Sequence, residues 1–298
     1  MPSDRVLGLG YMQAATDRAP TRIDFYVPDG FVFTPDANGA ATGSVVGSDV
    51  IAISTLPPEH PLTGVLTIEE PAAFATEGLA CTGGSTHDAV WAASVPAPTG
   101  AFKIPIFVDG RTFTICPAVA RLGGTPTAIA FQLGLVSNSG INRPLVRAPS
   151  APGRFVWSAT VMRAGLPDVE IRSIVDLPQR AIFTARVVRG IVRISGRVTA
   201  NRRGIPHVRI HANVAKKRMG GVDFYGRTRA DGRFTLIHRL RRGTFFVRVN
   251  SYSDQRDVTA GGCAVPSAAA GGCVSATEMI LGLQAAPATI RVRSGGSP

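Results

Sequence analysis

The sequence predicts an all-β protein made of two β-sandwich domains. Short runs of apolar residues recur along the chain, and glycine and proline separate them. Helical periodicity is scarce, since only residues 71–79 offer one or two turns, which would form a connector. At 298 residues the chain exceeds the usual size of one sandwich, so two domains with full cores are expected.

The first domain follows a polar lead. Residues 1–20 show no periodicity and are expected to form a flexible tail. From Thr21 onward, regular short strands with turn signals between them predict an Ig-like sandwich over 21–186. The predicted strands are 22–27, 44–54, 62–69, 89–95, 101–108, 128–136, 153–162, 169–175 and 181–188.

The second domain is predicted over 187–298, because an acidic-to-neutral half gives way to an arginine-rich half near residues 185–190. Between 196 and 250, turns at 204–206, at Asp231-Gly232 and at 242–244 separate apolar-alternating runs. This segment carries no set of residues that could perform chemistry together. A binding or structural role is therefore favoured over an enzyme.

The net charge of +12 is placed unevenly. Residues 1–180 hold 12 Lys and Arg against 15 Asp and Glu, whereas 181–298 hold 20 against 5. Such a field attracts phosphorylated or uronic polymers, nucleic acid or an anionic membrane surface, with strong salt dependence. The competing interpretation is a solvated arginine-rich surface, because the basic residues are almost all arginine and the chain is also rich in Ala, Gly and Pro, as in proteins of GC-rich genomes.

The four cysteines, Cys81, Cys116, Cys263 and Cys273, fall as one pair in each half. Of the three possible connectivities, 81–116 with 263–273 needs no contact between domains. Two disulfides indicate an oxidising compartment. A four-thiolate metal site and four free thiols remain alternatives, although no C-x-x-C spacing supports the metal.

The sequence predicts a secreted or cell-envelope protein on its cysteines, but its first residues do not resemble a signal peptide, since Asp4 is acidic and the apolar stretch is short. A trimmed or misassigned start would reconcile the two. No run approaches the roughly 18 consecutive apolar residues of a membrane-spanning helix.

His207, Arg209 and His211 form the first candidate ligand-binding group. Two histidines four residues apart chelate zinc on a helix, but Val208 and Ile210 alternate with them as in a strand. The histidines would then lie about 13 Å apart, too far for one metal ion. The sequence therefore predicts an outward strand face, either solvated or in contact with a ligand, and no metal site or cofactor.

Other chemical motifs are weak. Ser85, His87 and Asp88 have the residue types of a hydrolase triad, but neighbours in an extended segment cannot converge. Glu69 and Glu70 are adjacent and would point to opposite faces of a strand. No catalytic residue is predicted.

A second candidate group consists of Arg239, Arg241 and Arg242, which follow the basic cluster 216–218. Nucleic-acid sites add aromatic side chains for stacking. Phe224, Tyr225, Phe234, Phe245 and Phe246 are available, but their spacing predicts core positions. The sequence thus favours acidic polysaccharide, a cell-wall polymer or an envelope protein as partner over nucleic acid.

Four segments resemble the carboxypeptidase regulatory-like domains, which are transthyretin-like (prealbumin-like) sandwiches. They are GRV at 196–198, GIPHV at 204–208, TRADGRF at 228–234 and GT at 243–244, within about a third of the chain. The resemblance implies a transthyretin-like second domain without catalytic residues. Such modules occur beside enzymes, in surface adhesins and in envelope receptors.

The N-terminal half resembles a group of exported actinobacterial proteins of unknown role. The resemblance is carried by IDFYVP at 23–28, by Cys81 before Val90-Trp91, and by RSIVDLP at 172–178. It implies export.

Taken together, the sequence predicts a non-catalytic exported binding or scaffolding protein that recognises acidic or glycan polymers through its arginine-rich second domain. The alternatives are a structural pair of sandwiches whose strand edges recruit a protein, and an accessory part of an enzyme system with a site at the domain junction.

Overall fold

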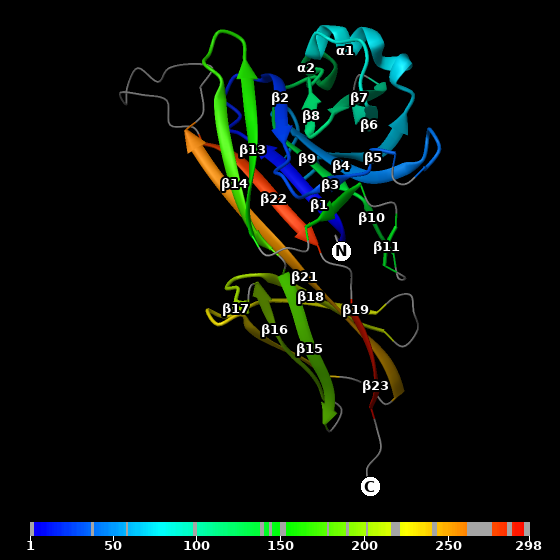
Figure 1. Cartoon of the computed structure of the whole chain (residues 1–298), viewed down its shortest axis with the longest axis vertical. Helices are drawn as coiled ribbons and strands as arrows, with labels where there is room; N and C mark the ends of the chain where they lie inside the picture. The colour runs from blue at the N-terminus through cyan, green and yellow to red at the C-terminus, as the bar shows by residue number, and fades with distance from the viewer. Residues whose placement is uncertain are drawn as a thin grey trace.

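The computed structural model describes residues 3–294 apart from 37–38, 58, 98–99, 138–139, 143–144, 150–152, 178, 189–190, 201, 216–220, 240–242, 261–275 and 285–287. The fold is all-β, which confirms the predicted class. Figure 1 shows two bodies, here called the large body, which holds the N-terminus, and the sandwich, which lies towards the C-terminus. Within the described residues, no helix has the length and apolar character needed to cross a membrane.

The large body is one continuous antiparallel ladder. Its strands are β1 (Ser3–Met12), β2 (Pro20–Tyr26), β4 (Val45–Ile53), β5 (Leu62–Glu69), β6 (Ala89–Ala97), β7 (Gly100–Asp109), β8 (Thr112–Ile115), β9 (Pro126–Leu133), β13 (Gly153–Arg163), β14 (Val169–Leu177), β22 (Ala276–Gln284) and the second half of β21 (Gly243–Ala260). They pair in the order β14-β13-β2-β8-β7-β6-β5-β4-β9-β1-β22-β21. The ladder curls until β14 contacts β21 and β22.

Small elements complete the large body. β3 (Val32–Phe33) pairs with β12 (Val146–Ala148), which in turn pairs with the first residues of β1. β10 (Leu135–Ser137) and β11 (Gly140–Asn142) form a separate hairpin. Every strand predicted between residues 22 and 188 is present, and that over 128–136 is divided into β9 and β10.

The core of the large body is a single apolar cluster inside the curled ladder. Trp91 and Trp157 are fully buried, and the Trp157 ring meets Phe31 edge-on at 5.0 Å. The alternation of inward and outward side chains along each strand produces this arrangement. Truncating either tryptophan to alanine would cost about 3–5 kcal/mol of folding free energy.

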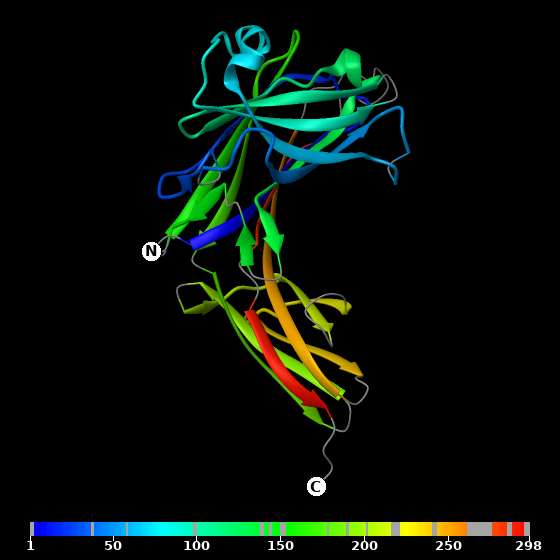
Figure 2. The same cartoon turned by 90° about the vertical axis from the view of Figure 1, so that its right-hand side faces the viewer.

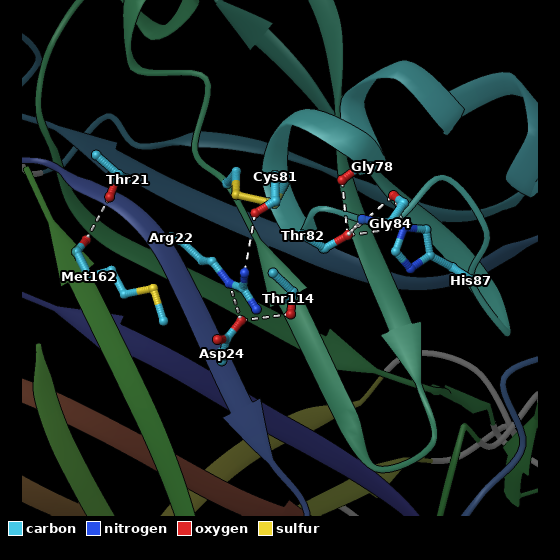
Figure 3. Close-up of a disulfide and its surroundings, with 11 residues drawn as sticks. Thr21, Arg22, Asp24, Gly78, Cys81, Thr82, Gly84, His87, Thr114 and Met162 are labelled. Atoms are coloured by element: carbon cyan, nitrogen blue, oxygen red, sulfur yellow. Dashed lines mark hydrogen bonds and ion pairs between the residues drawn. A yellow bond between two sulfur atoms is a disulfide. The ribbon is translucent and has the colours of Figure 1, made fainter.

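A short helical segment covers one end of the ladder. The turn η1 (Pro71–Phe74) leads into α1 (Ala75–Thr82), which ends at Gly83 with φ +82°, and α2 (Val119–Leu122) lies nearby. Cys81 at the end of α1 forms a disulfide with Cys116, which confirms this predicted pair (Figure 3). The predicted pair Cys263–Cys273 lies outside the described residues.

The sandwich consists of two facing sheets. One holds β15 (Gln179–Val188), β16 (Ile191–Ala200), β17 (Arg203–Gly204) and β20 (Arg233–Arg239), with β16 central. The other holds β19 (Val222–Arg227), β18 (Arg209–Ala215), the first half of β21 and β23 (Ala288–Ser294), in that order. Apolar side chains from β16 and β20 meet those from β18 and β21 in a second core.

The predicted flexible tail is wrong. Residues 3–12 form β1, which pairs with β9 on one side and β22 on the other. Leu7, Leu9 and Tyr11 are buried in the core. This strand is hard to recognise in the sequence. Gly8 and Gly10 alternate with its apolar residues where a strand usually has polar side chains, so the alternation of apolar and polar residues is missing.

The predicted division at 186/187 is also wrong in two respects. β14 ends in the large body at Leu177 and β15 begins in the sandwich at Gln179, so the chain changes body near residue 178. Later it returns: β21 runs from the sandwich into the large body, as Figure 2 shows, and β22 follows it there. No glycine or proline interrupts β21 after Gly243, so the sequence gives no signal of this crossing.

Candidate functional site

The predicted ligand-binding residues fall on two opposite faces of the sandwich. Arg209 and His211 lie on β18, whereas Arg239 ends β20 in the other sheet. His207 is not in a strand: it occupies a turn with φ +59°, and its backbone amide donates to the Thr228 carbonyl at 3.1 Å. Arg241 and Arg242 lie outside the described residues.

The alternation along β18 follows the predicted pattern. Ile210, Ala212 and Val214 are buried in the core, so Arg209 and His211 point outward. Nowhere in the described chain do three His, Cys, Asp or Glu side chains gather in a way that could hold a metal ion. The outward positions are therefore a polar surface.

We call this surface the tyrosine face, defined by Arg209, His211, Asn213, Asp223, Tyr225 and Arg227. Across β18 and β19, Arg209 lies opposite Arg227, His211 opposite Tyr225, and Asn213 opposite Asp223. The Asp223 carboxylate accepts a hydrogen bond from Asn213 Nδ2 at 2.7 Å and lies 3.0 Å from His211 Nε2. These contacts, with Asn213 the larger cause, hold the pKa of Asp223 below its usual value.

Tyr225 was not predicted as a surface residue. Its side chain is 66% exposed, and its ring stacks on that of His211 with 4.9 Å between centroids. The core prediction is correct for Phe234 and Phe245, which are buried. Tyr225 is exposed because it lies two residues before Arg227 in β19, and alternate residues of a strand point to the same side. This spacing was visible in the sequence.

The other sheet presents what we call the basic face. Its arginines lie on outward positions of β15, β16 and β20 and in the turn before β20, and all are exposed. Arg186 lies directly opposite Arg193, and Arg197 directly opposite Arg233. Like charges in such positions destabilise a sheet. The basic face comprises Arg186, Arg193, Arg197, Arg229, Arg233 and Arg239.

One carboxylate, Asp231, lies beside these arginines. Arg233 Nε lies 3.5 Å from the Asp231 carboxylate, and Arg197 Nε donates to the Asp231 carbonyl at 2.9 Å. Arg186, Arg193, Arg229 and Arg239 make no side-chain hydrogen bond or ion pair within the described chain. Within the described chain, most of the positive charge on this face is therefore not neutralised by carboxylates.

A shallow hollow of about 540 Å³ lies within the basic face. Arg193, Arg197, Arg229 and Arg233 line it together with the hydroxyls of Thr184, Ser195 and Thr235. Guanidinium groups bind carboxylate, sulfate or phosphate with paired hydrogen bonds, and hydroxyls add further donors. The arrangement can hold an extended anion, and it contains no nucleophile and base that converge on one point.

Ser85, His87 and Asp88 do not form a catalytic triad, because His87 and Asp88 bind other partners. Asp88 accepts from the Gly110 amide at 2.7 Å, and His87 Nδ1 instead lies 2.8 Å from Asp109. His87 Nε2 lies 3.4 Å from the hydroxyl of Thr82 (Figure 3), which superficially resembles a relay. The His87 side chain is only 2% exposed and Thr82 donates to Gly78 at 2.9 Å, so the group closes the end of α1.

A buried polar cluster in the large body is likewise structural. Arg163 Nη2 donates to the Tyr11 hydroxyl at 2.9 Å and to Gln13 Oε1 at 3.3 Å. Burial raises the pKa of Tyr11 to about 12. These groups are enclosed by protein, and their hydrogen bonds tie β1 to β13.

Comparisons with known proteins provide little. No protein family matches the sequence, and no curated protein is similar to it. Among solved structures, the D0-D1 domain of Intimin aligns over 81% of this chain and 90% of its own chain, at 10% identity and a TM-score of 0.20. A likeness at this level carries no argument. The resemblances to carboxypeptidase regulatory-like domains and to exported actinobacterial proteins therefore stay predictions.

Proposed function

We propose that this protein is a non-catalytic binding or scaffolding protein of the cell envelope or extracellular space, which holds acidic polysaccharide on its basic face. The observation that carries the proposal is the set of six exposed arginines on an open sheet, with a single carboxylate among them in the part of the chain that the structure describes. The cross-strand pairs Arg186–Arg193 and Arg197–Arg233 place like charges directly opposite each other, which destabilises the free protein. A bound polyanion would remove that repulsion.

Charge and shape favour a polymer over a small ligand. The arginines extend along the length of β16 and β20, a spacing of about 3.3 Å per residue that spreads the charge over several sugar units. Among the described residues, the exposed large apolar side chains of this face are Ile182, Ile191 and Ile237, and none is aromatic. Single-stranded nucleic acid is bound by stacking on aromatic rings, so an acidic glycan fits this face better.

The Cys81–Cys116 disulfide supports an oxidising compartment, because such bonds rarely persist in a reducing cytosol. Thiol titration of protein isolated from its native compartment, without added reductant, tests this part of the proposal. We expect no reaction at these two cysteines, and free thiols there would remove the argument for export.

A second candidate is an envelope protein that docks on the same face. Ile182 is 72% exposed and Ile237 is 65% exposed, and both lie among the arginines. Apolar contact of this kind is typical of the centre of protein interfaces. Binding through these isoleucines would persist at high salt, whereas binding of an acidic polymer would not.

Retention of the full-length protein on immobilised polymers tests the function. The panel is polygalacturonate, dextran sulfate, neutral dextran and single-stranded DNA, each at low and high salt. We expect retention on an acidic polysaccharide that salt abolishes, and weaker retention of Arg193→Glu/Arg197→Glu, which should elute at lower salt than the wild type. The control Arg111→Glu/Arg172→Glu makes the same charge change at exposed ion pairs of the large body. Equal retention of both variants, or selective retention on DNA, would contradict the proposal.

A further inference from the structure

A row of hydroxyl groups crosses the middle of the basic face. Thr184 on β15 lies directly opposite Ser195 on β16, and Ser195 lies directly opposite Thr235 on β20. Neighbouring strands are about 4.8 Å apart, so the three residues span about 10 Å. Their neighbours Ile194 and Phe234 are buried in the core, so the hydroxyls point outward. We call these three residues the hydroxyl row.

Arginine pairs flank the hydroxyl row on both sides. Arg186 lies opposite Arg193 on one side of the row. Arg197 lies opposite Arg233 on the other side. Along β16 the order is therefore Arg193, Ser195, Arg197, and at about 3.3 Å per residue the two arginine positions lie about 13 Å apart. The row and the arginines line the same hollow, which is positive at both ends and neutral in the middle.

The hydroxyl row differs chemically from the arginines beside it. A guanidinium group only donates hydrogen bonds, whereas a serine or threonine hydroxyl donates one and also accepts. Within the described chain, the side chains of the row make a single contact, 3.4 Å between Ser195 Oγ and Thr235 Oγ1, and Thr184 makes none. The row therefore offers acceptors to the hydroxyl groups of a neutral sugar, and it offers no positive charge to a carboxylate.

We infer that the basic face selects a polysaccharide in which acidic and neutral sugars alternate. The polymer lies along β16, its acidic groups accept hydrogen bonds from the two arginine pairs, and the neutral sugar between them exchanges hydrogen bonds with the hydroxyl row. A polymer with a carboxylate on every sugar would place one carboxylate over the row, away from the guanidinium groups. This inference rests on the proposed function and adds the class of polymer.

Two polymers separate the sugar pattern from the charge. Hyaluronan alternates glucuronate with N-acetylglucosamine, whereas polygalacturonate carries a carboxylate on every sugar. Equilibrium titration measures the binding of full-length protein to chains of matched length at one salt concentration. Charge density alone favours polygalacturonate. We expect instead that the wild type binds hyaluronan about tenfold more tightly, the effect of one or two net hydrogen bonds.

Removing the hydroxyl row tests its role. Thr184→Val/Ser195→Ala/Thr235→Val keeps every arginine, and valine suits a strand as well as threonine does. We expect the affinity for hyaluronan to fall about tenfold and the affinity for polygalacturonate to stay unchanged. Circular dichroism and urea unfolding check that the variant is folded. Should it not fold, Ser195→Ala alone removes the central hydroxyl and should lower the preference for hyaluronan.

Thr63→Val/Ser158→Ala is the matched control. It makes the same two kinds of exchange at outward positions of β5 and β13 in the large body. The control should bind both polymers like the wild type.

The outcomes are distinct. Wild-type protein that binds polygalacturonate at least as tightly as hyaluronan overturns the inference and leaves the proposed function intact. A preference for hyaluronan that persists without the hydroxyl row, or that the control variant loses equally, also overturns the inference, because the row does not then select the polymer. Failure to bind any acidic polysaccharide overturns the proposed function and the inference with it.

Discussion

Gly204 and Gly232 lie back to back where β17 meets the turn before β20. A Cβ atom on Gly204 would lie 1.9 Å from the Asp231 carbonyl oxygen, and one on Gly232 would lie 2.4 Å from that of Val198. Gly232 also has φ +79°, a conformation that favours glycine. The sequence predicts a tight turn at Asp231-Gly232, and the positive φ confirms it. The turn nevertheless joins strands of two different sheets, β19 and β20.

Replacing Gly204 by alanine should therefore destabilise the protein. Overpacking against backbone atoms costs about 1–3 kcal/mol, and urea unfolding measures it. Gly84→Ala is the matched control, because its nearest atom would be 3.6 Å away. An equal midpoint for both variants would show that the close approach of the two glycine backbones is not needed.

Asp49 makes stability depend on pH. Its side chain is 1% exposed, neither carboxylate oxygen has a hydrogen-bond partner among the described residues, and burial raises its pKa from 3.8 to about 6. The folded state therefore binds the proton more tightly than the unfolded state. The associated stability is fully present below about pH 4 and is lost as the pH rises through 6, a loss on the order of 3 kcal/mol.

Asp49→Asn should remove this dependence. The neutral amide keeps the shape, so the variant should gain stability relative to the wild type as the pH rises from 4 to 7.5. Urea unfolding of both proteins at several pH values measures the difference. A difference that stays constant across this range would mean that Asp49 ionises normally in the folded protein.

At the scale of elements, β1 is the clearest test of the fold. A flexible tail would tolerate any substitution, but Leu9 is only 2% exposed between β9 and β22. Leu9→Ala should cost about 2–5 kcal/mol. Met12→Ala serves as control, because Met12 is 38% exposed at the end of the same strand. A negligible change in the free energy of unfolding for Leu9→Ala would show that residues 3–12 form a flexible tail and not a buried strand.

The strands illustrate what a sequence can predict here. Alternation predicts β2, β4 to β7, β9 and β13 to β15 well, because each has one apolar face and ends at glycine, proline or a turn. It also predicts that Arg209 and His211 point outward. It cannot tell which sheet a strand joins, because pairing partners are set by tertiary packing. For that reason the sequence could not show that the two candidate groups, represented by Arg209 and Arg239, lie on opposite sheets.

The chain connects the large body and the sandwich at more than one place. The chain crosses between the bodies near residue 178, again along β21, and once more between β22 and β23. β21 pairs with β18 and β23 at one end and with β22 at the other, so it is part of both sheets. A relative rotation of the bodies would break these ladders.

The two bodies should therefore unfold together. Trp91 and Trp157 both report on the large body, and hydrogen exchange in β16 and β20 reports on the sandwich. We expect the same denaturant midpoint from both signals. A sandwich that loses protection well before the tryptophan fluorescence changes would show that β21 does not couple them.

Binding of acidic polysaccharide to the basic face can be measured by equilibrium titration of full-length protein with polygalacturonate at several salt concentrations. The titration compares the wild type with Arg193→Glu/Arg197→Glu and Arg111→Glu/Arg172→Glu. We expect charge reversal on the basic face to weaken binding at least tenfold, about 1.4 kcal/mol, and to reduce its salt dependence, while the control variant binds like the wild type. Equal weakening by both variants would mean that only net charge attracts the polymer, which would contradict a site on the basic face.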